Sequence, residues 1–379
     1  MIKKLKILLL IPAGRVGSTF FLSLTDRHEQ IMQFPGEFFF DEFWSKIKNK
    51  SNSEEICNIF LRDYKYFFNS QYNKVDRLNQ LGSKRNKIFK VSTILFYKNF
   101  CKFFKQKNNL NKKIHIINSL HLAYSSASGE IVKKKKLIVI NAHDYSRLKV
   151  YEEVDVSIVY MIRHPIAILN SSFKNWMSYK NGILLRPRSF LFFCNKLILG
   201  LPSILKMKKK TYIIQLEILH KNSHFLLKDF CKIFHIKLKK SLFISTFHGL
   251  RWWGDSVSGK FLHGFNINFK NEIYEKNFYK KDIYTIEKSL NYFLKKYNYS
   301  KKNRSVIFSF PYLNFLPFKM ELKLLKKSFY NFDFVDIFLF PLYLILRIKI
   351  TSGTINYKKL PYSIGTRKIK KKSIANYYS

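Results

Sequence analysis

A turn rich in groups that bind anions follows the first apolar run of the chain. Leu5 to Ile11 is apolar, and the next letters read PAGRVGSTF. A strand, a turn and a helix start in this order leave the first backbone N–H groups of the helix pointing outward, where they attract an anion. Arg15 adds a fixed positive charge, and two hydroxyls add donors. We therefore predict a phosphate cradle formed by Arg15, Val16, Gly17, Ser18, Thr19 and Phe20.

The cradle departs from the phosphate loop of ATP and GTP hydrolases. That loop has four residues between its first glycine and a Gly-Lys-Ser/Thr sequence. Here only Arg15 and Val16 separate Gly14 from Gly17, and no lysine follows. The pattern therefore disfavours a standard nucleotide hydrolase. The alternative for this segment is a plain strand-turn-helix whose hydroxyls only cap the helix.

A second strand and helix offer another anion site in the middle of the chain. Val156 to Ile162 is a nearly continuous apolar run, typical of a strand buried on both faces, and Pro165 fits the first turn of a following helix. Arg163 ends the strand and Ser171 lies about two turns into the helix, so both could reach one phosphate. Taken singly, Arg163 could instead pair with a carboxylate, and Ser171 could be an ordinary helix serine.

Three segments, in this order, resemble the PAPS-dependent sulfotransferase family, where PAPS is 3′-phosphoadenosine 5′-phosphosulfate. Arg15 to Thr19 resembles the loop that holds the 5′-phosphosulfate, and Arg163 with Ser171 resembles the site for the 3′-phosphate. The third segment, Ser245 to Phe265, resembles the G-x-x-W-x-G-[ND]-S element of the carbohydrate and bacterial branch. The small-phenol branch carries lysine where Arg15 stands. The resemblance covers about residues 5 to 300.

The resemblance implies a reaction and its cofactor. A sulfonate group would pass from PAPS to a hydroxyl of a carbohydrate, glycolipid or other lipid-linked acceptor, leaving 3′,5′-adenosine bisphosphate and needing no metal. Arg15 would stabilise charge on the departing phosphate, although an arginine cannot readily donate its proton. Trp252 or Trp253 would offer a ring to adenine in a loop that includes Gly254. The alternative is that both tryptophans are simply buried.

The reaction also needs a general base to take the proton of the acceptor hydroxyl. Glu37 follows a short strand, Ile31 to Phe34, and stands where related enzymes present an acid to the acceptor. His143 follows the strand Leu137 to Asn141 and matches the family's K-[ST]-P-x-H strand end only in the histidine. Glu37 ranks first of the two. A surface ion pair for Glu37 and a hydrogen-bonded cleft role for His143 are the alternatives.

Further elements follow from periodicity and predict an α/β fold, with a parallel sheet flanked by helices and a P-loop-like nucleotide-binding core. Glu217, at the end of another short strand, resembles part of the family's y-E-D-L element, and we expect it to be a structural partner of a basic residue. Residues 108–136, polar at both ends, are expected to form an insertion over the acceptor cleft. Helical patterns fill Phe38–Phe68 and much of Lys87–Phe104, and helices are predicted over Ser189–Lys206 and Asn271–Tyr297.

Composition leaves two rival functions open. The chain has 69 Lys and Arg against 24 Asp and Glu, a formal net charge of +45, which suits a nucleic acid, an anionic membrane or an acidic glycan. No RNA-recognition pattern or zinc-finger spacing accompanies this charge, so we expect no specific nucleic acid. The rivals are a phosphotransferase, with Asp144 as its candidate magnesium ligand, and a non-catalytic basic protein that binds nucleic acid or membrane.

Cysteine and histidine usage points to a reducing compartment and to no metal site. The four cysteines lie far apart, and the ten histidines form no ligand motif. Met1 to Ile11 is too short for a signal peptide and includes the strand before the cradle, so a cytoplasmic protein is expected.

The C-terminal region differs from the rest of the chain. Phe334 to Leu346 is strongly apolar but contains Asp336 and Pro341, and it is shorter than the ~20 residues of a transmembrane helix. We expect a catalytic domain over 1–302 and a helical, apolar and basic extension over 303–379. Residues 334–349 would either lie on the inner face of a membrane, as a peripheral contact, or pack onto the enzyme core.

Overall fold

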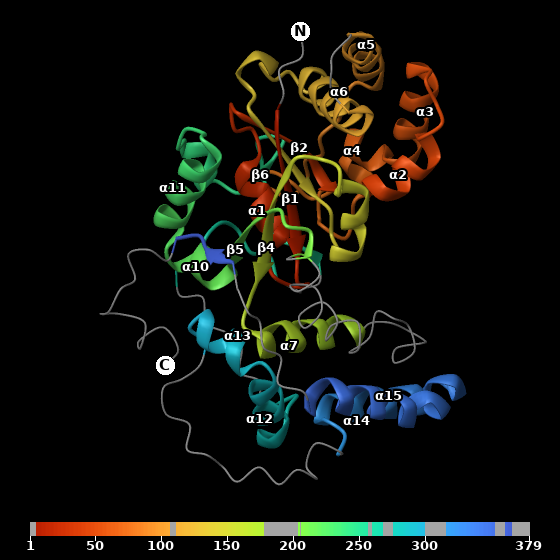
Figure 1. Cartoon of the computed structure of the whole chain (residues 1–379), viewed down its shortest axis with the longest axis vertical. Coiled ribbons are helices and arrows are strands. Elements are labelled where there is room, and N and C mark those ends of the chain that lie inside the picture. The colour runs from red at the N-terminus through yellow and green to blue at the C-terminus, as the bar shows by residue number, and fades with distance from the viewer. Residues whose placement is uncertain are drawn as a thin grey trace.

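The computed structural model describes residues 5–106, 111–177, 204, 206–256, 260–267, 276–299, 316–352 and 361–365. Within these residues, a parallel sheet with the strand order β2-β3-β1-β4-β5-β8 forms the centre of the molecule (Figure 1). The predicted α/β fold, a parallel sheet flanked by helices, is confirmed. The strands of this sheet are β1 Lys6–Pro12, β2 Ile31–Glu37, β3 Leu137–Asn141, β4 Val156–Ile162, β5 Lys210–Gln215 and β8 Tyr362–Ser363.

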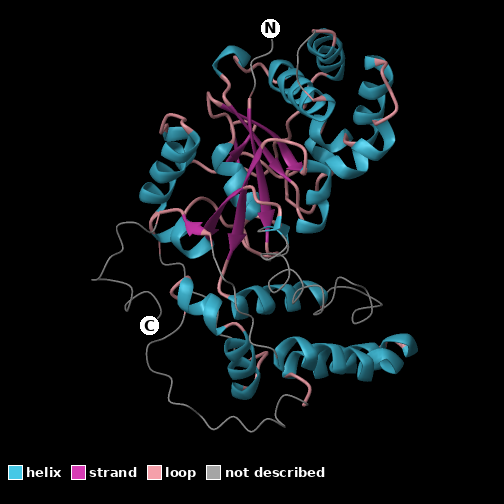
Figure 2. Ribbon diagram, in the orientation of Figure 1, coloured by secondary structure: helices cyan, strands magenta, loops and turns pink. Residues whose placement is uncertain are grey.

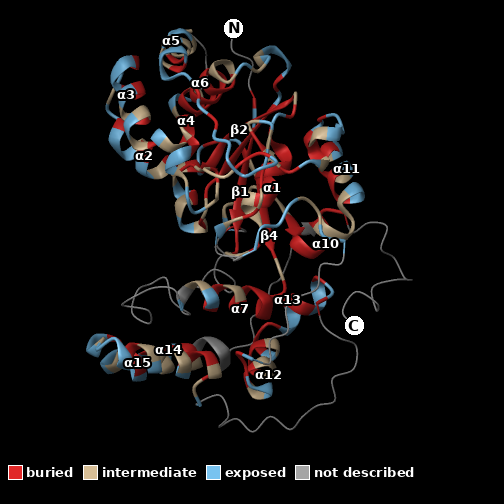
Figure 3. Cartoon of the chain, turned by 180° about the vertical axis from the view of Figure 1, so that it is seen from behind, coloured by how far each residue is buried: buried red, intermediate tan, exposed pale blue. Residues whose placement is uncertain are grey.

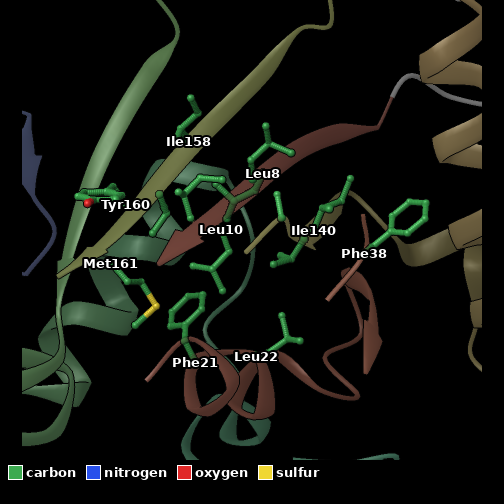
Figure 4. Packing of buried hydrophobic residues seen from close by; sticks show 14 of the residues in the cluster. Leu8, Leu10, Phe21, Leu22, Phe38, Ile140, Ile158, Tyr160 and Met161 are labelled. Carbon is green, nitrogen blue, oxygen red and sulfur yellow. The ribbon is translucent and has the colours of Figure 1, made fainter. Parts of the chain in front are cut away.

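The central strands are apolar because neighbouring elements cover both of their faces. All of β1 except Lys6 is buried, and all of β4 except Ser157. Figure 4 shows buried apolar side chains on both faces of these strands, with Met161 directed toward Phe21 of the nearby helix, which also contributes Leu22. A nearly continuous apolar run is the pattern expected of parallel strands that are covered on both sides.

The order of the strands fixes where a ligand can bind. From β1 the chain crosses β3 to reach β2, whereas from β4 it continues to β5 on the other side. The connections after the adjacent strands β1 and β4 therefore leave in opposite directions, and α/β proteins commonly bind ligands outside the carboxyl ends of strands at such a point. Pro12 pairs with Met161 at this edge, so Arg15 and Arg163 follow neighbouring strand ends.

Helices surround the sheet, and a group of them lies beyond the carboxyl ends of β1 and β4 (Figures 1 and 2). Helices α1 and α6 pack against β2. The two-stranded antiparallel pair of β6 and β7 precedes the tryptophan-rich loop. The bounds are α1 Ser18–Thr25, α2 Phe40–Ile47, α3 Ser53–Asp63, α4 Lys65–Phe68, α5 Thr93–Phe104, α6 Lys112–Ala127, α7 Pro165–Trp176, α10 Leu216–Lys221, α11 Ser223–Phe234, β6 Thr246–Phe247, β7 Leu250–Arg251, α12 Lys280–Ser289, α13 Asn291–Lys296, α14 Lys319–Tyr330 and α15 Phe334–Ser352.

The expected insertion over residues 108–136 is wrong, because α6 is a core helix. It packs against α5 and β2, and most of its residues are buried. Its buried residues include the polar Asn118, Ser119 and His121, which break the apolar periodicity that identifies a core helix in a sequence. Burial lowers the pKa of His121 to about 4, and its ring centroid lies 4.2 Å from that of Phe34.

Two other regions that were predicted to be helical each hold more than one helix. Phe38–Phe68, where helical patterns were predicted, contains the three helices α2, α3 and α4, and α3 begins after the cap residue Asn52, whose side chain accepts a hydrogen bond from the N–H of Glu54. In the predicted span Asn271–Tyr297, α12 and α13 are separated by Leu290. The predicted helix Ser189–Lys206 and Cys194 lie outside the described residues, except for residues 204 and 206.

The C-terminal region contacts the rest of the molecule in two ways. Helix α15 packs on α14 and α12, and β8 adds an edge strand to β5, with the N–H of Ile364 donating to the carbonyl of Ile213 at 2.9 Å. The predicted boundary at residue 302 lies in a stretch outside the described residues and stays a prediction. Within the described residues, no helix has both the length and the apolar character needed to cross a membrane.

Candidate functional site

The cradle after β1 has the backbone geometry of an anion site. Gly14, Arg15 and Gly17 all have positive φ, at 86°, 51° and 77°. Gly17 is the N-cap of α1 and has no side chain to occupy the first N–H groups of the helix. A Cβ at Gly17 would lie 2.6 Å from Cδ1 of Leu216, so glycine is required both by the φ angle and by the close packing against α10.

The structure brings Arg15 and Ser171 into direct contact. Nε of Arg15 donates to Oγ of Ser171 at 3.3 Å, although the two residues are 156 positions apart. The predicted 5′-phosphosulfate loop and the predicted 3′-phosphate helix therefore meet in one place. Asp255 is the second partner of Arg15, with Oδ2 at 3.2 Å from Nη2, and about a quarter of each side chain is exposed.

The buried carboxylate of Glu217 holds the backbone that follows β4. Glu217 accepts a hydrogen bond from the N–H of His164 at 2.9 Å and another from the hydroxyl of Tyr299 at 2.9 Å. Burial raises the pKa of Glu217, and the backbone N–H of His164 and the charge of Arg163 oppose this rise. Glu217 thus orders the segment that carries Arg163, in agreement with the structural role expected of it.

The loop at 245–256 runs along α1 and ends at the cradle. Near the end of α1, Ser23 and Ser245 are joined by a hydrogen bond of 2.7 Å between their hydroxyls. Asp26 accepts from Thr246 Oγ1 at 2.8 Å and from the N–H of Gly249 at 2.9 Å. Since Asp255 reaches Arg15 at the other end of α1, the loop is tied to this helix at both ends.

Both tryptophans of this loop hold other backbone segments. Nε1 of Trp252 donates to the carbonyl of Asp76 and Nε1 of Trp253 to that of Gly82, each at 2.7 Å. Trp252 is only 4% exposed and its ring packs edge-on against Phe247. The adjacent Gly254 is buried with φ at 82°. A role for Trp252 in adenine stacking stays a prediction, and it would require a change in this packing.

The two candidate bases form a pair. Glu37 ends β2 next to Asn141 at the end of β3, and Nδ1 of His143 is in hydrogen-bond contact with Oε1 of Glu37. His143 has a positive φ of 63°, which turns the chain sharply after β3. About two fifths of its side chain is exposed, and a similar share of Glu37. The pair therefore faces solvent at the same sheet edge as the cradle.

Sequence reasoning missed Asp76, which contacts the cradle directly. The hydroxyl of Thr19 donates to Oδ1 of Asp76 at 3.3 Å, and Nδ2 of Asn73 donates to Oδ2 at 3.1 Å. Burial raises the pKa of Asp76 to about 6, and the nearby charges of Glu37 and Asp255 add to this rise. Asp76 lies in a polar stretch next to no predicted strand, so nothing in the sequence marks it.

The remaining cradle residues serve packing as well. Val16 is buried, and Phe20 stacks on His220 of α10 with ring centroids 4.8 Å apart. Burial lowers the pKa of His220 to about 4, with a smaller contribution from the charge of Arg163. Phe265 lies edge-on to Phe20 at 5.4 Å. The rings of Phe20, His220 and Phe265 thus form an aromatic cluster next to the cradle, which the sequence did not predict.

Asp144, the magnesium ligand of the rival phosphotransferase hypothesis, has a structural role. It is buried, and Oδ1 accepts from the N–H of Ser146 at 2.9 Å as the cap of a short 3₁₀ turn. Among the described residues, no group of three or more His, Cys, Asp or Glu side chains is placed to hold a metal ion.

Comparisons with known proteins found similarity in solved structures alone. No protein-family model and no curated protein matches the chain. A sulfotransferase domain from the olefin synthase of Synechococcus PCC 7002 is 12% identical, with a TM-score of 0.36, over 64% of this chain and 78% of that one. A sulfotransferase domain from the curacin biosynthetic pathway has the same identity and TM-score, over 71% of this chain and 88% of that one.

Proposed function

We propose that the chain is a PAPS-dependent sulfotransferase that acts on a hydroxyl group. The single observation that carries the proposal is the meeting of the cradle with α7, where Nε of Arg15 lies 3.3 Å from Oγ of Ser171. The two segments come from adjacent strands at a switch point of the sheet, where α/β proteins bind nucleotides. We propose that one nucleotide with phosphates at both ends lies across them.

The residues present suit a nucleotide of this kind. The first N–H groups of α1 and the guanidinium of Arg15 would hold the 5′ end, while Arg163 and Ser171 would hold the 3′-phosphate. Phe20 and its aromatic neighbours line the same side of the cradle. When bound, PAPS supplies an activated sulfonate whose S–O bond to the 5′-phosphate breaks as the acceptor oxygen attacks sulfur.

Arg15 must change partners for this to happen. Its guanidinium is held by Asp255 and Ser171, and the 5′-phosphate of the nucleotide would replace Asp255 as its counterion. Once there, Arg15 and the amides around Gly17 would stabilise the charge that grows on the departing phosphate. This electrostatic contribution is the main catalytic role that we assign to the cradle.

The paired Glu37 and His143 would remove the proton from the acceptor hydroxyl. A carboxylate at Nδ1 fixes the ring and leaves Nε2 free to accept a proton, as in other carboxylate–histidine pairs. We therefore propose His143 as the base and Glu37 as the residue that orients it, which reverses the order favoured by the sequence. The acceptor class that we propose is a carbohydrate or a lipid-linked sugar, by resemblance to the carbohydrate branch.

Two experiments test the proposal. Thermal unfolding of the full chain should shift upward with 3′,5′-adenosine bisphosphate in the absence of metal, and less with ATP and Mg²⁺ or with a short RNA. Incubation with labelled PAPS and a cell extract should then yield a labelled product that identifies the acceptor. A shift with ATP and Mg²⁺ alone would support the phosphotransferase instead, and a shift with RNA alone would support a nucleic-acid-binding protein.

A further inference from the structure

The helical hairpin of α14 and α15, residues 316–352, buries several charged and polar side chains and exposes a stripe of apolar ones. In α15, the residues Asp336, Phe340, Tyr343 and Arg347 follow a helical spacing and are all at most 8% exposed. A second stripe of the same helix, Phe334, Phe338, Leu342 and Ile345, is between 53% and 79% exposed. A helix that faces water normally shows the opposite arrangement.

The inner polar residues of the hairpin are paired with one another. Arg347 and Glu321 are both fully buried, with Nε and Oε1 3.4 Å apart, and Tyr343 donates to the same oxygen at 2.7 Å. Asp336 accepts from the hydroxyl of Ser328 at 3.0 Å. These contacts fix which stripe of α15 faces α14, so the exposed apolar stripe is a consequence of a specific packing.

The outer surface extends beyond α15. Phe329, Tyr330 and Phe332, at the turn between the two helices, are 56%, 72% and 76% exposed. Figure 3 shows the exposed colours along α14 and α15, in contrast with the buried strands β1 and β4. Single exposed hydrophobic residues are common on proteins, but so many on one helical hairpin are typical of an interaction site.

The charges of the hairpin favour an anionic partner. The hairpin has three acids, of which Glu321 and Asp336 are buried and Asp333 is half-buried. Helix α14 contains several lysines, of which Lys326 is exposed. An apolar surface with basic residues nearby and no exposed acid in the described hairpin suits an anionic lipid surface, since lysines attract the headgroups while apolar side chains enter the acyl boundary.

We propose that the hairpin of α14 and α15 binds the surface of an anionic lipid bilayer through its outer apolar stripe, without crossing the bilayer. The hairpin is also connected to the candidate site. Lys327 Nζ donates to the carbonyl of Met177, just after α7, and Lys323 Nζ lies 5.9 Å from the ring centroid of Phe173 on α7. Helix α7 carries Ser171, so a bound membrane would lie near the candidate site. This inference is independent of the proposed reaction.

Flotation of the full chain with vesicles tests the proposal. We expect the wild type to float with vesicles of phosphatidylcholine and phosphatidylglycerol, and much less with phosphatidylcholine alone. The double variant Phe338→Asp/Leu342→Asp should partition at least about a hundredfold more weakly, because two large apolar side chains lose their burial. The matched control is Ile94→Asp/Leu95→Asp on α5, where the side chains are 69% and 51% exposed; it should float like the wild type.

A second variant keeps the proposal testable if the aspartates disturb folding. Phe338→Trp preserves the apolar character, and its fluorescence should shift to the blue and be quenched by brominated lipid, whereas Ile94→Trp should show neither effect. A wild type that does not float, or an unquenched tryptophan at 338, would overturn the proposal. A dimer in solution that the Phe338→Asp/Leu342→Asp variant abolishes would assign the surface to a second copy of the chain.

Discussion

Replacing Asp255 by asparagine should strengthen the binding of 3′,5′-adenosine bisphosphate, because the carboxylate competes with the nucleotide for Arg15. The ion pair between them measures 3.2 Å, and about a quarter of each side chain is exposed. Pairs exposed to this degree contribute up to about 1 kcal/mol. Release of the guanidinium should therefore lower the dissociation constant by roughly fivefold.

Isothermal titration calorimetry of the wild type and the Asp255→Asn variant measures this change. The control is Asp63→Asn, which removes one negative charge from a surface pair with Lys46 of 2.9 Å. Because Asp63 belongs to α3 and has no part in the proposed site, its loss should leave the affinity unchanged. If Asp255→Asn binds the nucleotide no more tightly than wild type, or more weakly, Asp255 does not act as a competing counterion and the proposed exchange of partners is wrong.

Three other predictions concern the site. Glu37→Gln and His143→Ala should each lower turnover by about a hundredfold while keeping nucleotide affinity. The double variant should lose little more turnover than either single variant, since the two residues act together. If the two losses multiply in a transfer assay, the residues do not act as a pair. Because burial raises the pKa of Asp76 to about 6, this carboxyl ionises near Thr19 as the pH rises through 6, and nucleotide affinity should then fall roughly fivefold. The Asp76→Asn variant should not show this fall in affinity, and a variant with the same pH profile as the wild type would refute the prediction. Gly17→Ala should lower the free energy of unfolding by more than Gly129→Ala does. Both glycines have a φ near 77°, so both variants carry a backbone strain of about 1 kcal/mol, but only the Cβ at position 17 clashes with Leu216, since a Cβ at position 129 meets nothing within 4 Å. Equal losses in denaturant unfolding would contradict this packing.

The features that the sequence predicts best are those determined by residues close to one another in the sequence. The apolar runs that became β1, β3 and β4 lie where they were expected, because buried parallel strands need apolar side chains on both faces. The turn of Gly14 to Gly17 was also readable, since only glycine tolerates a positive φ without cost. Carboxyl ends of parallel strands share one edge, so Arg15 and Arg163 could be expected to lie close together.

Features that depend on distant contacts were not predictable in the same way. No local pattern shows that Asp255 pairs with Arg15 across 240 positions, or that Asp76 reaches Thr19. Helix α6 escaped recognition because its inner face includes polar residues such as Asn118. In α15, hydropathy indicates an apolar helix, but only the buried pair of Arg347 and Glu321 reveals which stripe faces outward.

The central claim is that Arg163 and Ser171 hold the 3′-phosphate of the same nucleotide whose 5′ end lies in the cradle. Calorimetric titration with 3′,5′-adenosine bisphosphate and with 5′-AMP, which lacks the 3′-phosphate, tests it most directly. The wild type should prefer the bisphosphate by about 10- to 100-fold, as expected for hydrogen bonds to a charged group. Arg163→Ala should abolish this preference and Ser171→Ala should reduce it, each with little change in 5′-AMP affinity. A wild type that binds both ligands equally, or an Arg163→Ala variant that keeps the full preference, would contradict the account.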